Sequence, residues 1–455
     1  MLYPHQRTLI DEVQRTFAQG AESVMMQGPC GFGKTHTVAE GIIVPSLAYG
    51  RRFVFAAHLE ELLDDTRARL AAYGLRVGVV KSGRPSDPDA PVQVASTPTL
   101  ARMLERGAAL PHADRLILDE AHRGSSRGNR AIIQHYRQRG ARVLGLSASP
   151  ARGDDQALDE FQAMVLGPSV KSLIAGGFLV APRLFAPKMA LQRGVAENPV
   201  TVVTQQCVGR RCMVFAPDAK SAAQIAANIP NAETIVENTP PAVRATVRDR
   251  LASGETQHVV TVRALLEGFD APVIDTVILC AAFTTIVPYI QGCGRGMRAY
   301  RNPVTGEPKR NCIIHDLRGA VHLHGLPDDD RRWSLDGVQG TSDTSIARRR
   351  CADCHAIFPP SSRCPNCGSR HTVDTRPMRI QRTEMFEASN ISPMDRVGMW
   401  LDGAVRAIQR RKPNVSVEWA RATVMRKPPS WVREAIEREH ERMLAEGDGG
   451  QEKQA

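Results

Sequence analysis

The sequence lacks a long apolar run and an apolar leader. None of its apolar stretches approaches the roughly 18 uninterrupted apolar residues that a membrane-spanning helix requires. The first residues, Met1-Leu-Tyr-Pro-His-Gln6, contain no apolar signal segment. The sequence therefore predicts a cytoplasmic protein with no membrane partner.

The sequence also lacks the features of a disulfide-bonded or repeat protein. Six of its ten cysteines are scattered singly along the chain, and thiols in a reducing compartment stay free. The other four cysteines form one cluster, considered below. The chain shows no internal repeat and no low-complexity tract.

The length and the charge narrow the class of protein further. A chain of 455 residues is too long for one hydrophobic core and suits two core-forming domains with smaller pieces. Its apolar content of 42% and charged content of 24% are those of an ordinary globular protein. The net charge of +11 and the pI of about 9.4 favour a polyanionic partner, although many basic proteins bind no nucleic acid.

Short apolar segments alternate with helical patterns over the first 187 residues. Residues 35–47 and 60–73 have helical patterns and lie between apolar segments. Strands that alternate with helices predict a parallel sheet covered on both faces. The segments with the length and character of buried strands are 23–27, 53–57, 77–80, 92–96, 116–118 and 143–147.

The strand pattern starts again after a segment typical of a linker, which contains Gly176, Gly177, Pro182 and Pro187. The second set of candidate strands covers residues 212–215, 234–236, 258–262, 276–279 and 312–314. We therefore expect two α/β domains and two smaller pieces beyond them. The expected boundaries are 1–187 and 195–345 for the α/β domains, 346–372 for a zinc-binding module and 373–455 for a helical basic region.

A complete nucleotide phosphate loop occupies residues 28–35, Gly28-Pro-Cys-Gly-Phe-Gly-Lys-Thr35. Glycines such as Gly28, Gly31 and Gly33 let backbone amides curl around phosphate oxygens at a helix N-terminus. Lys34 is expected to reach the β- and γ-phosphates, and the Thr35 hydroxyl is expected to ligate Mg²⁺. A glycine-rich structural turn is the alternative, but the full motif between a strand and a helix favours ATP.

A pair of acids follows the apolar residues 116–118, in the sequence Asp119-Glu-Ala-His122. Two acids can simply end a strand. With a phosphate loop upstream, Asp119 is expected to hold the Mg²⁺ and Glu120 to polarise the water that attacks the γ-phosphate. His122 is less specific, because a lone histidine is more often a packing residue. Together the two motifs predict ATP hydrolysis.

The order of these motifs resembles that of the superfamily 2 DEAD/DEAH-box helicases. Ser147-Ala-Ser149 is similar to the third motif of that family, which couples hydrolysis to movement. The coupling set implied is thus His122, Ser147 and Ser149. Tyr3-Pro-His-Gln6 resembles the family's "R-P-Y-Q" entry motif, which implies that Gln6 contacts adenine, although Tyr3 and His5 replace the usual arginine and tyrosine.

The second half of the chain supplies the remaining motifs of the resemblance. Gln291-Gly-Cys-Gly-Arg-Gly-Met-Arg298 resembles motif VI, which implies a catalytic Gln291 and implies that Arg295 and Arg298 reach across a cleft to the γ-phosphate. A basic surface loop is the alternative. Leu265-Leu-Glu-Gly-Phe-Asp270 resembles motif V; it retains Gly268 and Asp270 but has Leu266 in place of a threonine. Residues 214–216 are a weak match to motif IV.

The resemblance covers about residues 1–335 and implies two RecA-like domains within an α/β fold. Residues 58–66 and 95–100 resemble nucleic-acid-contacting motifs, but both are equally ordinary helix and strand-end sequences. His324-Gly-Leu-Pro and Trp333-Ser-Leu-Asp-Gly resemble the RadD-type and phage-encoded branch. Type III restriction motor subunits are broader relatives.

The clustered cysteines have the spacing C-x₂-C-x₉-C-x₂-C. Each pair can grip one Zn²⁺ from a tight turn, which completes a four-thiolate site of a zinc-ribbon-like module. Four thiolates leave no open position, so the zinc is expected to be structural. Disulfides or free thiols are the alternatives, and a zinc module in RadD-like proteins supports the metal. The expected ligands are Cys351, Cys354, Cys364 and Cys367.

The C-terminal region combines tryptophans with basic residues. An apolar stripe follows Ser392-Pro393, and Ser430 precedes a second helical pattern. Trp400, Trp419 and Trp431 favour a packed helical region. Base stacking or partner contact is the alternative.

These features together predict an ATP-dependent DNA helicase or translocase that requires ATP, Mg²⁺ and Zn²⁺. The RadD-like resemblance favours DNA over RNA and implies repair, recombination or phage replication. DNA-repair or replication proteins are the protein partners expected, through the C-terminal region. The alternatives are a remodelling translocase that does not unwind, an RNA helicase, and a zinc-dependent adaptor with an inactive motor.

Overall fold

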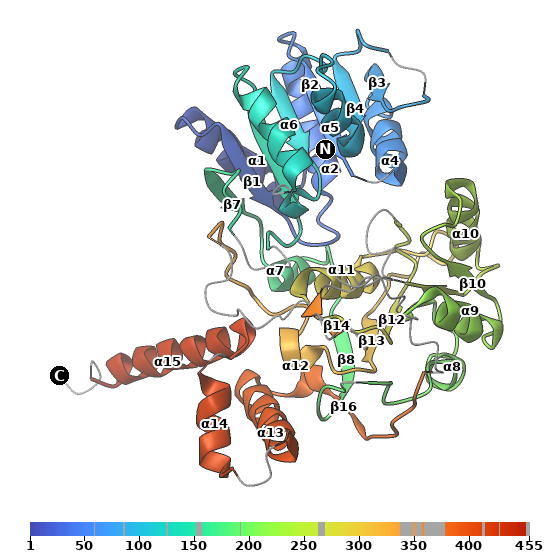
Figure 1. Ribbon diagram of the computed structural model, residues 1–455, viewed down its shortest axis with the longest axis vertical. Helices are drawn as coiled ribbons and strands as arrows, with labels where there is room; N and C mark the ends of the chain where they lie inside the picture. The colour runs from blue at the N-terminus through green and yellow to red at the C-terminus, as the bar shows by residue number, and fades with distance from the viewer. Residues whose placement is uncertain are drawn as a thin grey trace.

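The computed structural model describes most of the chain. The described residues are 1–58, 60–84, 87–123, 126–151, 157–191, 193–262, 269–336, 349–350, 357–358, 378–411, 415–426 and 428–451. They form two α/β units and a set of C-terminal helices (Figure 1). We call residues 1–179 the first unit, and residues 180–336 with strand β16 the second unit.

The first unit is built on a seven-stranded sheet in the order β3-β4-β2-β5-β6-β1-β7, in which every pair of neighbours is parallel. The expected strands are all present within a residue, and β7 is an addition at the edge. The strands are β1 (Ser23–Gln27), β2 (Phe53–Ala57), β3 (Val77–Val80), β4 (Val92–Ser96), β5 (Arg115–Leu118), β6 (Arg142–Ser147) and β7 (Ala163–Leu166).

Helices cover both faces of the first sheet, and β1, β2 and β4 are therefore buried at every position. Two apolar clusters result, one on each face. The helix after β1 contains a π-helical turn, η1, between two α-helical pieces. The helical elements are α1 (Pro4–Ala18), α2 (Lys34–Val38), η1 (Ala39–Ile43), α3 (Val44–Leu47), α4 (Glu60–Ala71), α5 (Thr97–Glu105), η2 (Ala121–Arg123), α6 (Arg127–Arg137) and α7 (Val170–Ala175).

The second unit has a seven-stranded sheet in the order β10-β11-β9-β12-β13-β8-β16. Only β16 is antiparallel to its neighbour, β8. The strands are β8 (Pro182–Pro187), β9 (Cys212–Phe215), β10 (Ala232–Ile235), β11 (His258–Thr261), β12 (Thr276–Leu279), β13 (Cys312–Asp316) and β16 (Met385–Glu387). Its helical elements are α8 (Pro199–Thr201), η3 (Val202–Gln206), α9 (Ala219–Ala227), α10 (Pro241–Ser253), α11 (Ile286–Met297) and α12 (Val321–His324).

Two features of the second sheet differ from the segmentation expected from the sequence. The expected linker is partly a strand, because residues 182–185 of β8 pair with residues 312–315 of β13. Residues 385–387, assigned to the C-terminal region, form β16 and extend the second sheet. The chain thus crosses into the second unit near Val180, whose amide donates to the Met297 carbonyl at 2.9 Å.

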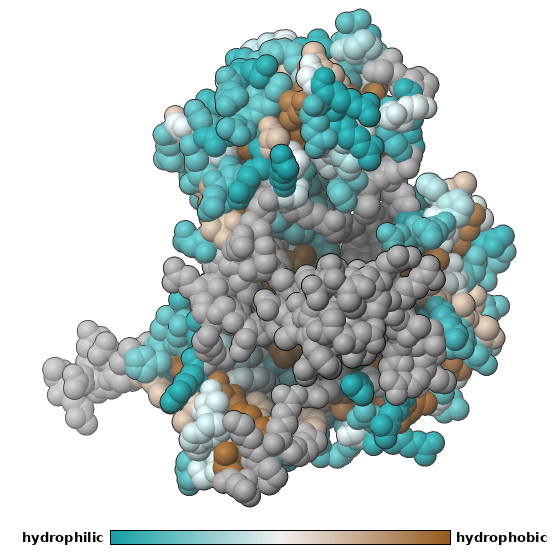
Figure 2. Space-filling model, in the orientation of Figure 1, coloured by the Kyte–Doolittle hydropathy of each residue, from teal (hydrophilic) through white to brown (hydrophobic). Residues whose placement is uncertain are grey.

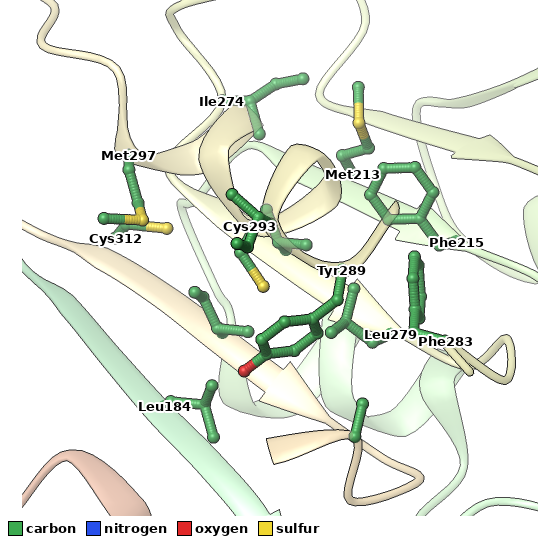
Figure 3. Packing of buried hydrophobic residues seen from close by; sticks show 14 of the residues in the cluster. Leu184, Met213, Phe215, Ile274, Leu279, Phe283, Tyr289, Cys293, Met297 and Cys312 are labelled. Atoms are coloured by element: carbon green, nitrogen blue, oxygen red, sulfur yellow. The ribbon is translucent and has the colours of Figure 1, made fainter. Parts of the chain in front are cut away.

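Helix α11 is anchored in the core of the second unit (Figure 3). Tyr289 and Cys293 point from this helix into a cluster with Leu184 and Leu279, and all four side chains are fully buried. The Tyr289 hydroxyl donates to the Gly325 carbonyl at 2.9 Å. This packing fixes the helix, and with it the motif at its C-terminal end.

The C-terminal helices α13 (Pro393–Arg411), α14 (Val417–Met425) and α15 (Ser430–Gln451) form a separate small core. Trp400 and Trp431 are buried in it, whereas Trp419 is 47% exposed. On the face shown in Figure 2, apolar residues reach the surface over α13 and α14. A short 3₁₀ turn, η5 (Ala388–Asn390), precedes α13, and β14 (Arg349–Arg350) pairs with β15 (Ile357–Phe358).

A buried ion pair attaches these helices to the second unit. Arg396 of α13 binds both carboxylate oxygens of Asp329, at 2.9 and 3.1 Å. The two side chains are only 8% and 13% exposed. None of the helices in the described part of the chain is long and apolar enough to cross a membrane.

Candidate active site between the two units

The phosphate loop links β1, which lies next to the edge strand β7 of the first sheet, to α2. Gly31 and Gly33 have φ values of 84° and 82°, a left-handed conformation that favours glycine. The Lys34 ammonium donates to the Gly28 carbonyl at 3.2 Å. Thr35 lies in the first turn of α2 and is partly exposed.

The free donors of this loop fit a polyphosphate. The backbone amides of Gly33, Lys34 and Thr35 have no hydrogen-bond acceptor among the described residues, as at the start of any helix. Such amides, together with a lysine, form an anion-binding cradle. ATP would be held here by residues 28–35, and the Mg²⁺ that accompanies it suits the Thr35 hydroxyl and the Asp119 carboxylate.

The two acids follow β5 beside this loop. Glu120 has a φ of 48°, one of two positive values outside glycine among the described residues. Its amide donates to its neighbour, the Asp119 carboxylate, at 3.0 Å. A non-glycine residue in this region costs about 1–3 kcal/mol, so the surrounding structure holds Glu120 in a strained turn.

A polar chain runs from Glu120 to the end of β6. The Nδ1 atom of His122 lies 3.3 Å from the Glu120 carboxylate and 3.2 Å from the Ser147 hydroxyl. The Ser147 hydroxyl accepts a hydrogen bond from the Ser149 amide at 3.2 Å. The Ser149 hydroxyl is buried and has no partner among the described side chains and backbone groups. Of the predicted coupling residues, His122 therefore contacts the predicted base directly, and Ser147 and Ser149 are connected to it through His122.

Charge around Glu120 keeps this carboxylate ionised. Burial alone would raise its pKa, but the hydrogen bond and charge of His122, with Lys34 and Arg295, lower the pKa to about 2. Lys34 comes from the phosphate loop and Arg295 from the second unit. The carboxylate therefore sits in a field to which both units contribute.

Helix α11 supplies two side chains to this region. The Gln291 amide donates to Glu120 Oε2 at 3.3 Å and is 4% exposed. Arg295 donates to the Phe269 carbonyl at 2.8 Å. Burial and the neighbouring Arg298 lower the pKa of Arg295 to about 10, so this guanidinium remains charged at neutral pH.

Arg298 follows the last residue of α11 and binds Asp270. Asp270 also accepts from Arg69 of α4 at 2.8 Å, so it joins the two units. Burial would raise the pKa of Asp270, but Arg298 and Arg69 lower it. A second ion pair between the units joins Arg248 of α10 to Asp65 of α4 at 3.7 Å.

The phosphate loop packs directly against α11. A Cβ atom at Gly294 would lie 2.6 Å from Cys30 Cβ, so only glycine permits this approach. A Cβ atom at Gly31 would lie 3.3 Å from Arg298 Cγ. Arg295 and Arg298 are therefore placed beside the loop by backbone packing, not by long flexible side chains.

Gln6 sits at the side of the phosphate loop. Its side-chain nitrogen donates to the Phe32 carbonyl at 2.9 Å, and its oxygen accepts from the Tyr3 amide at 3.1 Å. Tyr3, His5 and Phe178 form an aromatic cluster next to it, with ring centroids 4.4 to 5.7 Å apart. Gln6 thus ties the start of α1 to the loop.

A cavity of about 160 Å³ lies behind the phosphate loop, between the units. Pro29 and Cys30 line it from the loop, Gly294 and Met297 from α11, and Trp333 from the segment after α12. The Leu158 amide donates to the Leu335 carbonyl at 2.7 Å, so that segment returns to the first unit.

Some residues predicted to have a functional role are not part of this site. Gly268 and the four cysteines Cys351, Cys354, Cys364 and Cys367 lie outside the described residues. Residues 95–100 form the end of β4 and the start of α5 and are mostly buried. Residues 60–66 belong to α4.

The sequence did not point to Arg69, Arg248 or Cys30. The two arginines resemble many other charged residues on exposed helix faces, so no local pattern distinguishes them. Cys30 occupies a variable position of the phosphate-loop motif. Its closeness to Gly294 depends on how the two units meet.

Comparison with known proteins identifies both units. Residues 1–152 match the family described as "Type III restriction enzyme, res subunit", and residues 199–300 match "Helicase conserved C-terminal domain". A 51.5 kDa protein of a Lactococcus phage (isolate 7-9) is 23% identical over 388 residues, which are 78% of this chain and 80% of the phage protein.

Two solved structures share the fold. The ATP-dependent Type ISP restriction-modification enzyme LlaBIII bound to DNA has a TM-score of 0.52 at 16% identity, covering 72% of this chain and 29% of its own. The DUF1998 helicase MrfA bound to DNA has a TM-score of 0.52 at 15% identity, covering 69% of this chain and 46% of its own. This chain thus spans less than half of either protein.

The two matched regions contain the phosphate loop, the acidic pair and the arginines that meet between the units. The two seven-stranded sheets are those of two RecA-like domains. The chain therefore belongs to the superfamily 2 helicases, enzymes that hydrolyse ATP, and is related to the motor subunits of type III restriction enzymes.

Proposed function

We propose that this protein is an ATP-dependent DNA helicase or translocase with its ATP site split between the two units. The observation that carries the proposal is the contact between Gln291 of the second unit and Glu120 of the first. A nucleic-acid motor must couple hydrolysis to relative movement of its domains. A catalytic carboxylate that accepts a hydrogen bond from the opposite unit provides that coupling.

The first unit supplies the groups that bind ATP and activate water. Lys34 and the loop amides neutralise phosphate charge, and Asp119 with Thr35 holds the magnesium ion, which supplies Lewis-acid chemistry at the phosphates. Glu120 is ionised and accepts the proton of the attacking water. Gln6 positions adenine from the edge of the loop.

The second unit completes the site. Arg295 and Arg298 stabilise the charge that spreads over the γ-phosphoryl oxygens in the transition state, a role that suits a permanently charged, planar group. Gln291 orients the Glu120 carboxylate. His122, Ser147 and Ser149 couple hydrolysis at that carboxylate to movement of β6. Gly268 and Asp270, in the segment that resembles motif V, contribute to nucleotide binding.

DNA is favoured as the nucleic acid because LlaBIII and MrfA, which share this fold, are each described as bound to DNA. The net charge of +11 suits a polyanion. The phage relative and the RadD-like motifs support a role in repair, recombination or phage replication, in the cytoplasm. Repair or replication proteins would bind the C-terminal region.

A structural Zn²⁺ held by Cys351, Cys354, Cys364 and Cys367 is part of the proposal, on the strength of the cysteine spacing. Metal analysis of the purified protein should give one zinc per chain. A Cys351→Ser/Cys364→Ser variant should lose that zinc. Full zinc content in the double variant would contradict this ligand set.

The function is tested by measuring ATP turnover with single-stranded DNA, duplex DNA and RNA in parallel. Stimulation by DNA alone supports a DNA motor. Equal stimulation by RNA removes the preference for DNA. Absence of stimulation by any of the three contradicts the motor and favours an adaptor.

A further inference from the structure

A second concave surface lies away from the ATP site, between the second unit and α13. It is a groove of about 910 Å³. Its walls come from five separate parts of the chain. The described residues that line it lie within 189–193, 282–284, 318–323, 381–383 and 399–407.

The charged residues that line the groove in the described part of the chain are all arginines. Arg193, Arg318 and Arg382 line it, and none of its described lining residues is an aspartate or glutamate. Arg193 and Arg382 are exposed, and neither forms an ion pair with any described residue. Guanidinium groups without a carboxylate partner are available to an anionic ligand.

The backbone that carries these arginines is fixed. The Val195 amide donates to the Arg379 carbonyl at 2.9 Å, and the Gln381 amide donates back to the Val195 carbonyl at 2.7 Å. The Gln381 side chain donates to the Arg193 carbonyl at 2.9 Å. The two exposed arginines therefore stand on paired segments on one side of the groove.

Apart from the arginines, most of the lining is apolar, and the polar residues Thr284, His322, Gln381 and Thr383 complete it. Phe283, Met399 and Trp400 line it, together with the small residues Gly403 and Ala404 of α13. Small residues on one helix face leave room for a flat ligand. An apolar floor below a rim of arginines is the combination that single-stranded nucleic acids occupy, with bases on the floor and phosphates on the arginines.

The groove is connected to the ATP site through one helix. Its wall at residues 282–284 comes directly before α11, and Arg295 lies in the last turn of that helix. A ligand in the groove would therefore contact the N-terminal base of the helix that places Gln291 and Arg295 next to Glu120.

We propose that this groove binds a single-stranded segment of nucleic acid, with Arg193 and Arg382 on its phosphates. The inference rests on the proposed function, because it supplies a second contact for the strand on which the motor acts. An acidic protein segment is the competing occupant, and the experiment distinguishes the two.

The test compares an Arg193→Ala/Arg382→Ala variant with an Arg15→Ala/Arg139→Ala control. The control removes the same charge from exposed sites of the first unit. Fluorescence anisotropy with 20-mer oligo(dU) and oligo(U) gives the dissociation constant at several salt concentrations. We expect the groove variant to bind about tenfold more weakly and to lose about 1.4 from the logarithmic salt slope, about 0.7 per phosphate contact.

The outcomes separate the groove from the motor. Weaker binding of the groove variant, with unchanged ATP turnover in the absence of nucleic acid, supports the inference, and the two oligonucleotides show whether the sugar matters. Wild-type affinity in the groove variant overturns the inference alone. No binding by the wild-type protein overturns the proposed function as well. Arginine-dependent binding of a poly-glutamate peptide, with oligonucleotide binding unchanged, assigns the groove to a protein and overturns the inference.

Discussion

The side-chain amide of Gln291 donates a hydrogen bond to the Glu120 carboxylate at 3.3 Å, across the boundary between the two α/β units. Glu120 stands in a strained turn after β5, and Gln291 stands on a helix packed in the other core. Any change in the distance between the units must alter this contact. The relationship therefore connects domain movement to the proposed general base.

Replacement of Gln291 by alanine should slow hydrolysis and spare ATP binding. A hydrogen bond to a charged group is worth about 1.5–3 kcal/mol, which corresponds to a loss of roughly ten- to a hundredfold in kcat. Steady-state kinetics gives kcat, and a fluorescent ATP analogue gives the affinity. Gln14→Ala on the exposed face of α1 is the matched control. An unchanged kcat would show that the contact plays no part in turnover.

Lysine should not replace Arg295 or Arg298. Arginine fingers contribute about 10³–10⁵-fold to phosphoryl transfer, and a lysine cannot reproduce the planar fork. Arg295→Lys and Arg298→Lys should each lower kcat by at least about a hundredfold. Arg301→Lys, a substitution at an exposed arginine of the following loop, is the control. Near-normal turnover by both site variants would place the arginines outside the reaction.

The acid limb of activity should depend on His122. Burial raises the pKa of Glu120, but His122 contributes most to lowering it, to about 2 from an ordinary 4.5. In the folded protein the Glu120 carboxylate therefore stays ionised until the pH falls toward 2. Its contribution to stability is complete above about pH 4.5 and is lost as the pH falls from there toward 2. His122→Ala should raise the pKa, so the acid limb of the kcat profile moves to higher pH. A His112→Ala control should leave the limb in place. A limb that does not move in His122→Ala contradicts this assignment.

The ion pair between Arg396 and Asp329 should hold the C-terminal helices to the second unit. Both side chains are largely buried, so Arg396→Ala leaves the Asp329 carboxylate without its bidentate partner and should cost about 3–5 kcal/mol in the free energy of unfolding. Burial would raise the pKa of Asp329, but Arg396 lowers it, and the net shift is downward. The ion pair therefore contributes fully to stability above the ordinary pKa of an aspartate, and this contribution is lost as the pH falls.

Urea unfolding measures this cost. Adding Asp329→Asn to Arg396→Ala should recover part of the loss, since a neutral amide is less expensive to bury than a charge. The surface pair Arg421 and Asp402, with both side chains more than half exposed, provides the comparison. Arg421→Ala should cost less than about 1 kcal/mol. Equal costs for the two alanine variants would mean that the buried pair does not anchor the helices.

Much of the fold could be predicted because its signals are local. The strands of the first sheet are short apolar runs with polar residues on both sides, and the phosphate loop has its whole motif within residues 28–35. The edge strands were harder. Pro182 begins β8 and Pro187 ends it, and two prolines close together indicate a linker unless the partner strand is known. Strand β16 pairs with β8 from about 200 residues further along the chain, which no periodicity reveals.

The site was predictable in its parts and less so in its assembly. The motif residues Lys34, Glu120 and Arg295 follow from sequence spacing. The ion pair between Arg69 and Asp270 does not, because it joins an ordinary helix face to a residue 201 positions away. The approach of Cys30 to Gly294 likewise depends on the meeting of the units. Contacts between domains are set by three-dimensional packing, which leaves no local pattern in the sequence.

The most direct test of the central claim is displacement of streptavidin from the end of a biotinylated single-stranded DNA. The wild-type protein with ATP should displace streptavidin, because hydrolysis between the units moves the protein along the strand. Glu120→Gln should bind ATP and DNA but displace none, because the amide cannot accept a proton from water. Displacement by Glu120→Gln at the wild-type rate, or none by the wild-type protein, would contradict an ATP-driven DNA motor.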